Sequence, residues 1–191
     1  MKPAGTARKD SSIRIIGGQF KRSLLPIAIK DGLRPTPNRV RETLFNWLGQ
    51  DLSGCCCVDA FAGTGALGFE AASRGAASVI LIEQNKTVCR QLDAIKSKLN
   101  ATSVSVFNGD ALARMASLAA ASQDVVFLDP PFNSELFLPA LKAASRIIKP
   151  NGLIYLESDR AWLDTELEPL RLSLFKSGKA GLVHFHLWKP S

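Results

Sequence analysis

The sequence predicts an α/β protein built on a doubly wound, seven-stranded mixed sheet. Between residues 55 and 156, short apolar runs alternate with amphipathic stretches of 10–15 residues, the pattern of parallel strands joined by crossover helices. A glycine-rich segment follows the first of these runs, as is usual where such a sheet binds a ligand. The last two apolar runs are too close for a crossover helix, so we expect them to form a C-terminal antiparallel hairpin.

The first 50 residues precede this alternation, and we expect them to form a small N-terminal extension. Residues 1–12 are polar and basic, which predicts a disordered tail. The segment Ile13–Ile29 alternates loosely around Gly17-Gly18, which predicts a β-hairpin. A helix is then expected with Thr36 as its N-cap and Pro37 at its first position.

The predicted domain boundaries are 1–12 for the tail, 13–50 for the extension and 51–191 for the sheet domain. Strands of the sheet are expected at Cys55–Ala60, Val79–Ile82, Val104–Phe107, Val125–Leu128, Leu153–Leu156, Leu170–Phe175 and Leu182–Trp188. Helices are expected within Gly63–Arg74 and at Lys86–Leu99, Ala111–Ala121, Glu135–Ile148 and Asp164–Pro169. Ligands of such sheets bind beyond the carboxyl ends of the strands, so candidate functional residues are sought there.

The net charge of +7 is concentrated in the N-terminal residues 1–41, which we call the basic arm. Residues 1–41 contain ten Lys and Arg and two acidic residues, a net charge of +8, whereas the rest of the chain carries −1. Such asymmetry is typical of a protein that binds a polyanion. No apolar run is long enough for a membrane span and no signal-peptide core is seen, so a cytoplasmic protein without membrane contact is expected.

The four cysteines are expected to be reduced and buried. Cys55, Cys56 and Cys57 lie in one apolar run, and the sequence contains no CxxC pair. The two histidines, His184 and His186, lie far away in the sequence, and we expect them to pack or to face solvent. No metal site is therefore predicted.

Two features at the predicted strand ends indicate an adenosine-containing cofactor. Gly63, Gly65 and Gly68 follow the first strand with the spacing GxGxxG, which allows a tight turn and a close approach of the backbone to a ligand. Glu83 ends the second strand, where an acid binds a ribose diol. Nicotinamide cofactors and S-adenosylmethionine both carry that diol, so the loop alone does not choose between them.

Further candidate cofactor residues flank this loop. Asp59 would lie near the methionine ammonium group of S-adenosylmethionine. Asp110, just past the third strand, caps the helix at Ala111, accepts a hydrogen bond from the adenine amino group, or does both. Phe61 and Ala111 complete the candidate cofactor set.

The tetrad Asp129-Pro130-Pro131-Phe132 follows the fourth strand and favours methyl transfer to an exocyclic amine. The lone pair of such an amine is delocalised, so a catalyst must accept hydrogen bonds from it and hold it in line with the methyl group. The Asp129 carboxylate and the Pro130 carbonyl can accept these bonds, and the two prolines stiffen the turn. Phe132 offers a face on which a flipped base can stack.

These motifs resemble those of the class I methyltransferases, which use S-adenosylmethionine. Residues 14–18 and Leu33–Leu48, with the sequence LRPTPNRVRETLFNWL, also closely resemble the N-terminal segments of the bacterial RsmD-type 16S ribosomal RNA guanine-N2 methyltransferases. The resemblance covers residues 13–188. It implies methyl transfer to the N2 amine of one guanine in 16S rRNA, with a partly assembled small subunit as substrate and a monomer as the enzyme.

The candidate RNA contacts are six residues of the basic arm: Lys21, Arg22, Arg34, Thr36, Arg39 and Arg41. Arg34 and Arg39 are expected to touch RNA phosphate or to help close the site, and the alternative is a solvated helix face. Members of the family often carry an Arg-Gly-Arg run after the first hairpin strand, whereas this chain has Lys21-Arg22 there.

Other functions share part of these motifs. A DNA adenine-N6 methyltransferase uses the same tetrad, but no separate target-recognition domain is visible in 191 residues. A non-catalytic RNA-binding or assembly factor that retains the cofactor would not need the tetrad. A nicotinamide-dependent oxidoreductase would need hydride-transfer residues that the sequence does not show. A protein glutamine methyltransferase usually has Asn at the first tetrad position, and it does not explain the basic arm.

Overall fold

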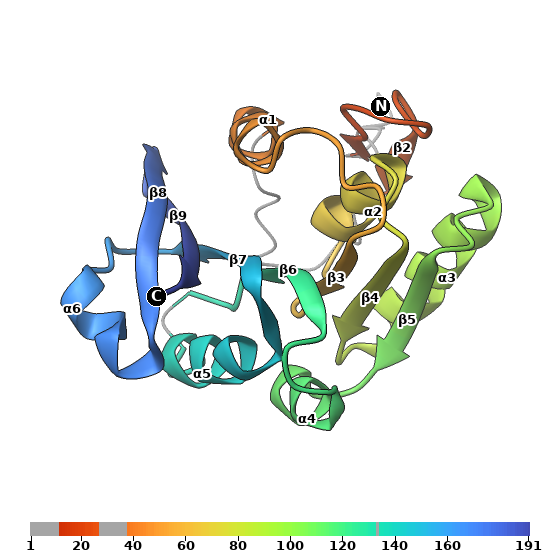
Figure 1. Ribbon diagram of the computed structural model, residues 1–191. Coiled ribbons are helices and arrows are strands. Elements are labelled where there is room, and N and C mark those ends of the chain that lie inside the picture. The colour runs from red at the N-terminus through yellow and green to blue at the C-terminus, as the bar shows by residue number, and fades with distance from the viewer. Residues whose placement is uncertain (1–11, 27–37, 133) are drawn as a thin grey trace, which may run out of the picture.

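The structure, a computed structural model, describes residues 12–26, 38–132 and 134–191 (Figure 1). The expected tail, except for Ser12, lies outside the described residues. So does the segment 27–37, which holds the candidates Arg34 and Thr36 and the expected helix start at Pro37. Within the described part of the chain, no helix is long and apolar enough to cross a bilayer.

The predicted seven-stranded mixed sheet is confirmed, with the strand order β5-β4-β3-β6-β7-β9-β8. The parallel strands are β3 (Cys56–Asp59), β4 (Ser78–Glu83), β5 (Val104–Asn108), β6 (Gln123–Leu128) and β7 (Ile148–Ser158). The C-terminal hairpin consists of β8 (Leu172–Ala180) and β9 (Val183–Pro190), and β9 pairs antiparallel with both β7 and β8. The chain order reverses between β3 and β6, which is the point where doubly wound sheets bind ligands.

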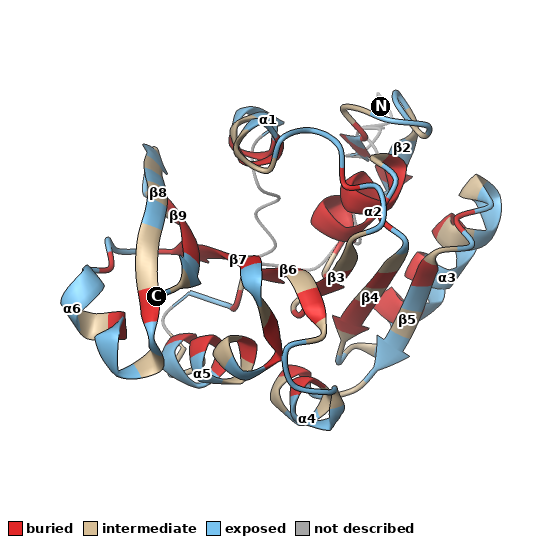
Figure 2. Ribbon diagram, in the orientation of Figure 1, coloured by how far each residue is buried: buried red, intermediate tan, exposed pale blue. Residues whose placement is uncertain are grey.

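Helices cover both faces of this sheet (Figure 1). One layer consists of α1 (Asn38–Trp47), α2 (Ala66–Ser73) and α3 (Lys86–Leu99), and the other of α4 (Ala111–Ser117), α5 (Phe137–Ile147) and α6 (Asp164–Leu167) with the 3₁₀ turn η1 (Glu168–Leu170). The strands between the layers are mostly buried, whereas the outer helix faces are exposed (Figure 2). Successive strand residues point into different layers, so Phe127 and Tyr155 pack under α1 and α2, and Val126 and Ile154 under α5.

The N-terminal extension shares its core with the sheet domain. β1 (Ser12–Arg14) and β2 (Leu24–Pro26) form the predicted antiparallel hairpin within the described residues. Ile13, Leu25 and Leu44 belong to the same buried cluster as Phe127 of β6. The extension is therefore fixed against α2 and the central strands by apolar burial.

Three predicted boundaries are wrong, each because strand pairing or helix capping overrides the local signal. The helix expected to reach Ala121 ends at Ser117. β7 begins at Ile148 rather than Leu153, because Ile148 pairs with Gln123 of β6 across a register shift. The segment between the two expected hairpin strands, 176–181, is largely strand, because β8 stays paired with β9 up to Ala180 and only Gly181-Leu182 remain for the turn.

Candidate active site

Each of the five parallel strands ends at or beside an acidic residue. Asp59 and Glu83 are the last residues of β3 and β4, Glu157 is the last but one of β7, Asp129 follows β6 directly, and Asp110 lies two residues beyond β5. Because the strands are parallel, these carboxyl groups lie along one edge of the sheet. An edge with so many carboxylates is suited to a cationic ligand.

The glycine loop after β3 is tied to two of these acids. Glu83 accepts hydrogen bonds from the N–H groups of Gly63, at 3.1 Å, and of Asn85, at 2.7 Å. Asp59 accepts one from the N–H of Gly68 at 3.0 Å. The loop and its two acids thus form one structural unit, although Gly63 and Glu83 lie 20 residues apart in the sequence. Phe61, between them in sequence, is half-buried.

Glycine is required at Gly65 for two separate reasons. Its φ of +75° is a left-handed conformation that residues with a Cβ avoid. A Cβ at this position would also lie 2.7 Å from the side chains of Leu92 and Phe69. Gly54 has a similar φ of +79°, but a Cβ there would meet nothing within 4 Å. Both positions therefore need a left-handed backbone, whereas only Gly65 also lacks the space for a side chain.

We expect Gly54→Ala to lower the free energy of unfolding by about 1–2 kcal/mol, because only the left-handed backbone is penalised. Gly65→Ala is expected to cost about 1–3 kcal/mol more, because the added methyl overpacks the loop against Phe69 and Leu92. Urea unfolding at constant pH measures both values. Equal losses for the two variants would show that Gly65 is needed only for its backbone conformation.

Asp110 caps α4. Its Oδ1 accepts a hydrogen bond from the N–H of Ala113 at 2.8 Å, and the helix begins at Ala111, so the capping interpretation is confirmed. The Asp110 side chain is also exposed. A contact with adenine remains a prediction that this geometry permits, because a carboxylate has a second oxygen with which to accept.

The tetrad after β6 combines a buried anchor with exposed reactive groups. Pro130 is buried and Asp129 partly exposed, whereas Pro131 and Phe132 are exposed, Phe132 to 38%. The Ser134 hydroxyl donates to the Pro131 carbonyl at 2.6 Å and closes the turn. A large aromatic ring left this exposed beside a carboxyl group is available to stack on a planar ligand.

The carboxyl groups of Asp59, Asp129 and Glu157 interact electrostatically. Burial, followed by the charges of Glu157 and Asp59, raises the pKa of Asp129 well above its usual value. Burial also raises the pKa of Asp59 to about 7, although the Gly68 N–H acts in the opposite direction. Glu157 is 3% exposed and accepts a hydrogen bond from the Tyr155 hydroxyl at 2.8 Å. Glu157 was not predicted from the sequence, although it follows the expected strand Leu153–Leu156 just as Glu83 follows the expected strand Val79–Ile82.

The prediction that Arg41 contacts RNA is wrong. Its side chain is fully buried, 3.7 Å from the carboxylate of Glu70, and it donates hydrogen bonds to the Arg14 carbonyl and the Asn38 side chain. The helical spacing of α1 places Arg41 on the same inward face as Val40 and Leu44. Burial lowers its pKa, and the charge of Glu70 acts most strongly against that effect. Arg41 thus attaches α1 to α2.

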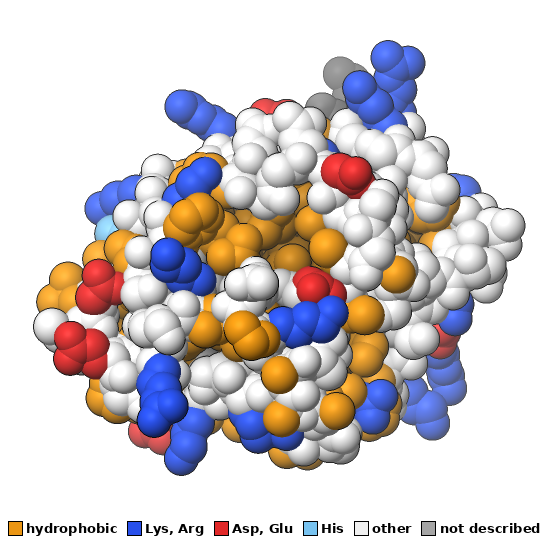
Figure 3. Space-filling model, in the orientation of Figure 1, with side chains coloured by type: hydrophobic (Ala, Val, Ile, Leu, Met, Phe, Trp, Pro, Cys, Tyr) orange, Lys and Arg blue, Asp and Glu red, His pale blue; other side chains and the backbone are white. Residues whose placement is uncertain are grey.

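The other described candidate cations are at the surface. Lys21, Arg22 and Arg39 are all exposed. Lys and Arg side chains project from the N-terminal extension in Figure 3, and more lie around the rim of a hollow with hydrophobic side chains in the middle of that face. These three residues are therefore accessible to a polyanion, as an RNA contact requires.

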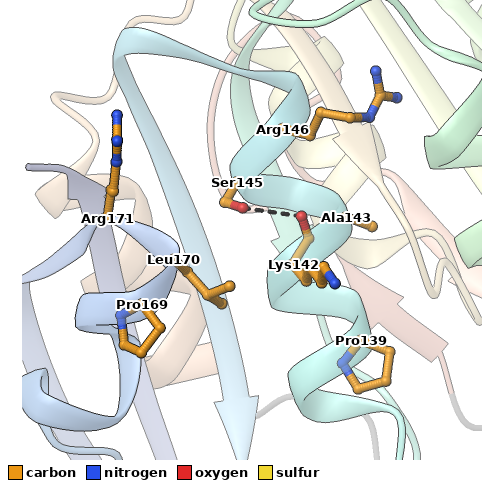
Figure 4. Close-up of a pocket in the computed structure, with 8 residues that line it drawn as sticks. All are labelled: Pro139, Lys142, Ala143, Ser145, Arg146, Pro169, Leu170 and Arg171. Carbon is orange, nitrogen blue, oxygen red and sulfur yellow. Dashed lines mark hydrogen bonds between the residues drawn. The ribbon is translucent and has the colours of Figure 1, made fainter.

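A groove of about 590 Å³ lies away from the acidic edge, between α5 and the segment after α6 (Figure 4). Lys142, Arg146 and Arg171 contribute cations to its lining. Arg146 is already occupied, because it donates hydrogen bonds to the carbonyls of Met115, Ala116 and Leu118. The described residues that line the groove include no carboxyl group, so the acidic edge remains the candidate site.

Of the two histidines of β9, His186 packs inside the fold and His184 is half-buried. His186 is buried, and its Nε2 accepts a hydrogen bond from the N–H of Trp162 at 3.2 Å. Its ring stacks between those of His184 and Trp188. Burial, aided by His184, lowers the pKa of His186 to about 4, so the ring is neutral at pH 7. No cluster of three or more His, Cys, Asp or Glu in the described segments could hold a metal ion.

Comparison with known proteins identifies the family. A family model described as "Conserved hypothetical protein 95" matches residues 13–189. The protein named "Ribosomal RNA small subunit methyltransferase D" from Escherichia coli K12 is 41% identical over 184 residues, covering 93% of this chain and 89% of the relative. Its namesake from Haemophilus influenzae is 38% identical over 195 residues, covering 99% and 100%.

The chain belongs to this RsmD family. A solved structure of the Escherichia coli protein yhhF, described as a "putative methyltransferase", superposes with a TM-score of 0.81 at 37% identity over 95% of this chain and all of that one. Precorrin-6y C5,15-methyltransferase from Geobacter metallireducens, at 20% identity and a TM-score of 0.63, shares the fold alone. The class I methyltransferase fold expected from the sequence is thus confirmed.

Proposed function

We propose that this RsmD-family protein transfers a methyl group from S-adenosylmethionine to the N2 amine of one guanine in 16S ribosomal RNA. The observation that carries the proposal is the row of carboxyl groups along one sheet edge, with the Asp129-Pro130 turn at the end of β6, the strand that pairs with β3, from which the glycine loop begins. This row provides both a site for a cationic methyl donor and an acceptor for an amine.

The residues at this edge fit S-adenosylmethionine. The glycine loop, held by the Glu83 and Asp59 carboxylates, leaves backbone without side chains where a ligand approaches. Glu83 would bind the ribose hydroxyls, Asp59 would lie near the methionine ammonium group, and Asp110 near the adenine. The sulfonium and ammonium charges of this donor complement the acidic edge. When bound, S-adenosylmethionine supplies an electrophilic methyl group.

Asp129, Pro130 and Phe132 would prepare the amine. The Asp129 carboxylate and the Pro130 carbonyl accept its two N–H groups, which returns electron density to the nitrogen. The exposed Phe132 ring stacks on the base and holds the nitrogen in line for transfer. Asp129 then takes the proton that the nitrogen loses.

The choice of RNA rests on charge and on relatives. The exposed Lys21, Arg22 and Arg39 would bind phosphate. Arg34 and Thr36, which lie outside the described residues, are proposed as further RNA contacts. The relatives above are named for the small-subunit ribosomal RNA. Three further parts of the proposal rest on the resemblance to the family. These are guanine N2 as the target, a partly assembled subunit as the substrate and a monomeric enzyme.

The test is a methyl-transfer assay with tritiated S-adenosylmethionine and three acceptors: naked 16S rRNA, partly assembled small subunits and duplex DNA. We expect label in the ribosomal RNA, and N2-methylguanosine after digestion and mass spectrometry of the nucleosides. N6-methyladenine in the DNA would support the alternative enzyme instead. Tight donor binding without label in any acceptor would support a non-catalytic assembly factor.

A further inference from the structure

Glu157 lies directly beside Asp129. The parallel strands β6 and β7 are in register, with Phe127 opposite Tyr155 and Leu128 opposite Leu156. Asp129 and Glu157 are the next residues after this last pair. Asp129 directly follows the end of β6, and Glu157 still belongs to β7. Asp129 is partly exposed at the edge, whereas Glu157 is 3% exposed behind it. The two carboxyl groups are therefore neighbours with different access to solvent.

Among the described residues, charged and titratable groups that interact with this pair include Tyr155, Asp59 and Arg41. Tyr155 of β7 donates its hydroxyl hydrogen to Glu157 at 2.8 Å and also senses the charge of Asp129. Asp59 of β3 adds a second negative charge, and Arg41 of α1 adds a positive charge that interacts with Glu157. The Tyr155 hydroxyl and the positive charge of Arg41 are thus the favourable partners of the Glu157 carboxylate beside Asp129.

We propose that Glu157 is a positioning residue for methyl transfer: its buried carboxyl group, fixed by the Tyr155 hydroxyl on the strand next to Asp129, assists Asp129 in taking the amine proton. The proposal rests on amine methylation as the function of this site. It assigns to Glu157 an effect on Asp129 and no contact with the substrate.

The proton must leave as the new bond forms. The amine nitrogen donates its lone pair to the methyl carbon while the carbon–sulfur bond breaks and its electron pair remains on sulfur. The nitrogen, now positively charged, releases one N–H proton to the Asp129 carboxylate, which later passes it to solvent. A neighbouring negative charge makes Asp129 a stronger base for this step. It destabilises the ionised form of Asp129 relative to the protonated form, so proton uptake becomes more favourable.

Two conservative variants separate the charge of Glu157 from its hydrogen bond. Glu157→Gln removes the charge but keeps an oxygen that can accept from Tyr155, whereas Tyr155→Phe removes the hydrogen bond and keeps the charge. We expect Glu157→Gln to move the Asp129 titration to lower pH by about one unit or more, and Tyr155→Phe to move it much less. Carbon-13 NMR of labelled aspartate in the folded protein, with Asp129 assigned by its absence in Asp129→Asn, measures this without substrate.

The same variants are compared in the rRNA assay. Ionised Asp129 is the active form, so activity falls as the pH falls through its pKa. Glu157→Gln is therefore expected to shift the acidic limb of the kcat profile to lower pH and to lower the plateau about three- to tenfold. Asp159→Asn, an exposed carboxylate on the loop after β7, is the matched control and should leave the limb in place.

An Asp129 titration that is the same in folded Glu157→Gln and wild type overturns the inference. The inference is also overturned if Asp129 of the wild-type protein titrates in the ordinary aspartate range. This second measurement can be made even if Glu157→Gln does not fold. A role in packing alone would slow both variants without moving the limb. Failure of the proposed function looks different: the wild-type protein would transfer no methyl group to rRNA at any pH, while the NMR titrations would still test the Asp129–Glu157 interaction.

Discussion

Replacing Asp129 with Asn is expected to lower kcat for methyl transfer about a hundredfold to a thousandfold, as the loss of one preorganised electrostatic group does in other enzymes. The Asn amide has one oxygen with which to accept a hydrogen bond, but its NH₂ group presents donors where the amine also donates. It carries no charge to offset the positive charge that develops on the nitrogen, and it cannot take the proton. Single-turnover assays with rRNA and saturating S-adenosylmethionine isolate this step.

The fold and the binding of S-adenosylmethionine are expected to survive the Asp129→Asn substitution. The side chains have nearly the same shape, and removing a carboxyl group with a raised pKa removes a desolvation cost. Asp93→Asn, on the exposed face of α3, is the matched control and should keep wild-type activity. A wild-type rate in Asp129→Asn, with the dissociation constant for the donor unchanged, would exclude Asp129 from the chemistry.

The sequence predicted what depends on local pattern. The strand–helix alternation gave the sheet, and the rule that ligands bind beyond the strand ends selected Asp59, Glu83 and Asp129 before their contacts were known. Their placement at one edge was predictable because chain order and parallel pairing alone bring strand ends together, and their roles in binding and catalysis stay predictions. The capping role of Asp110 is equally local, since its partner Ala113 is three residues away.

The features that the sequence did not predict depend on long-range contacts. Arg41 has the character of a surface cation in the basic arm, and only the position of Glu70 on α2 explains its burial. The extent of β8 is set by its pairing with β9, residue by residue, through a segment rich in Gly and Lys that locally resembles a loop. A charge pair or a strand register between distant segments has no periodic signature in either segment.

Glu70 is the buried centre of the contact between the N-terminal extension and the sheet domain. Its carboxylate forms ion pairs with Arg41 of α1 and Arg74 at the end of α2, at 3.7 and 2.8 Å. It also accepts the N–H groups of Ile16 and Gly17, at 2.7 and 2.8 Å, in the turn that follows β1. One carboxylate therefore satisfies four partners, two of which belong to the extension backbone. Because Arg41 is fully buried, removal of Glu70 would take away its largest favourable charge interaction.

Glu70→Ala is expected to lower the free energy of unfolding by about 3–5 kcal/mol, the usual cost of breaking a buried ion pair from one side. Urea unfolding at pH 7 measures this value. Glu42→Ala, on the exposed face of α1, should change it by no more than about 0.5 kcal/mol.

A second comparison tests whether the cost of losing Glu70 comes from the stranded Arg41 charge. In an Arg41→Met background that charge is absent, so Glu70→Ala should cost less than in the wild-type background by about 0.5–3 kcal/mol. The hydrogen bonds to Ile16 and Gly17 are lost in both backgrounds, so they cancel in the difference. Equal costs would instead assign the stability to these backbone hydrogen bonds and to Arg74. In either case the extension is held to α2 by Glu70, and this attachment fixes where Lys21 and Arg22 can meet RNA.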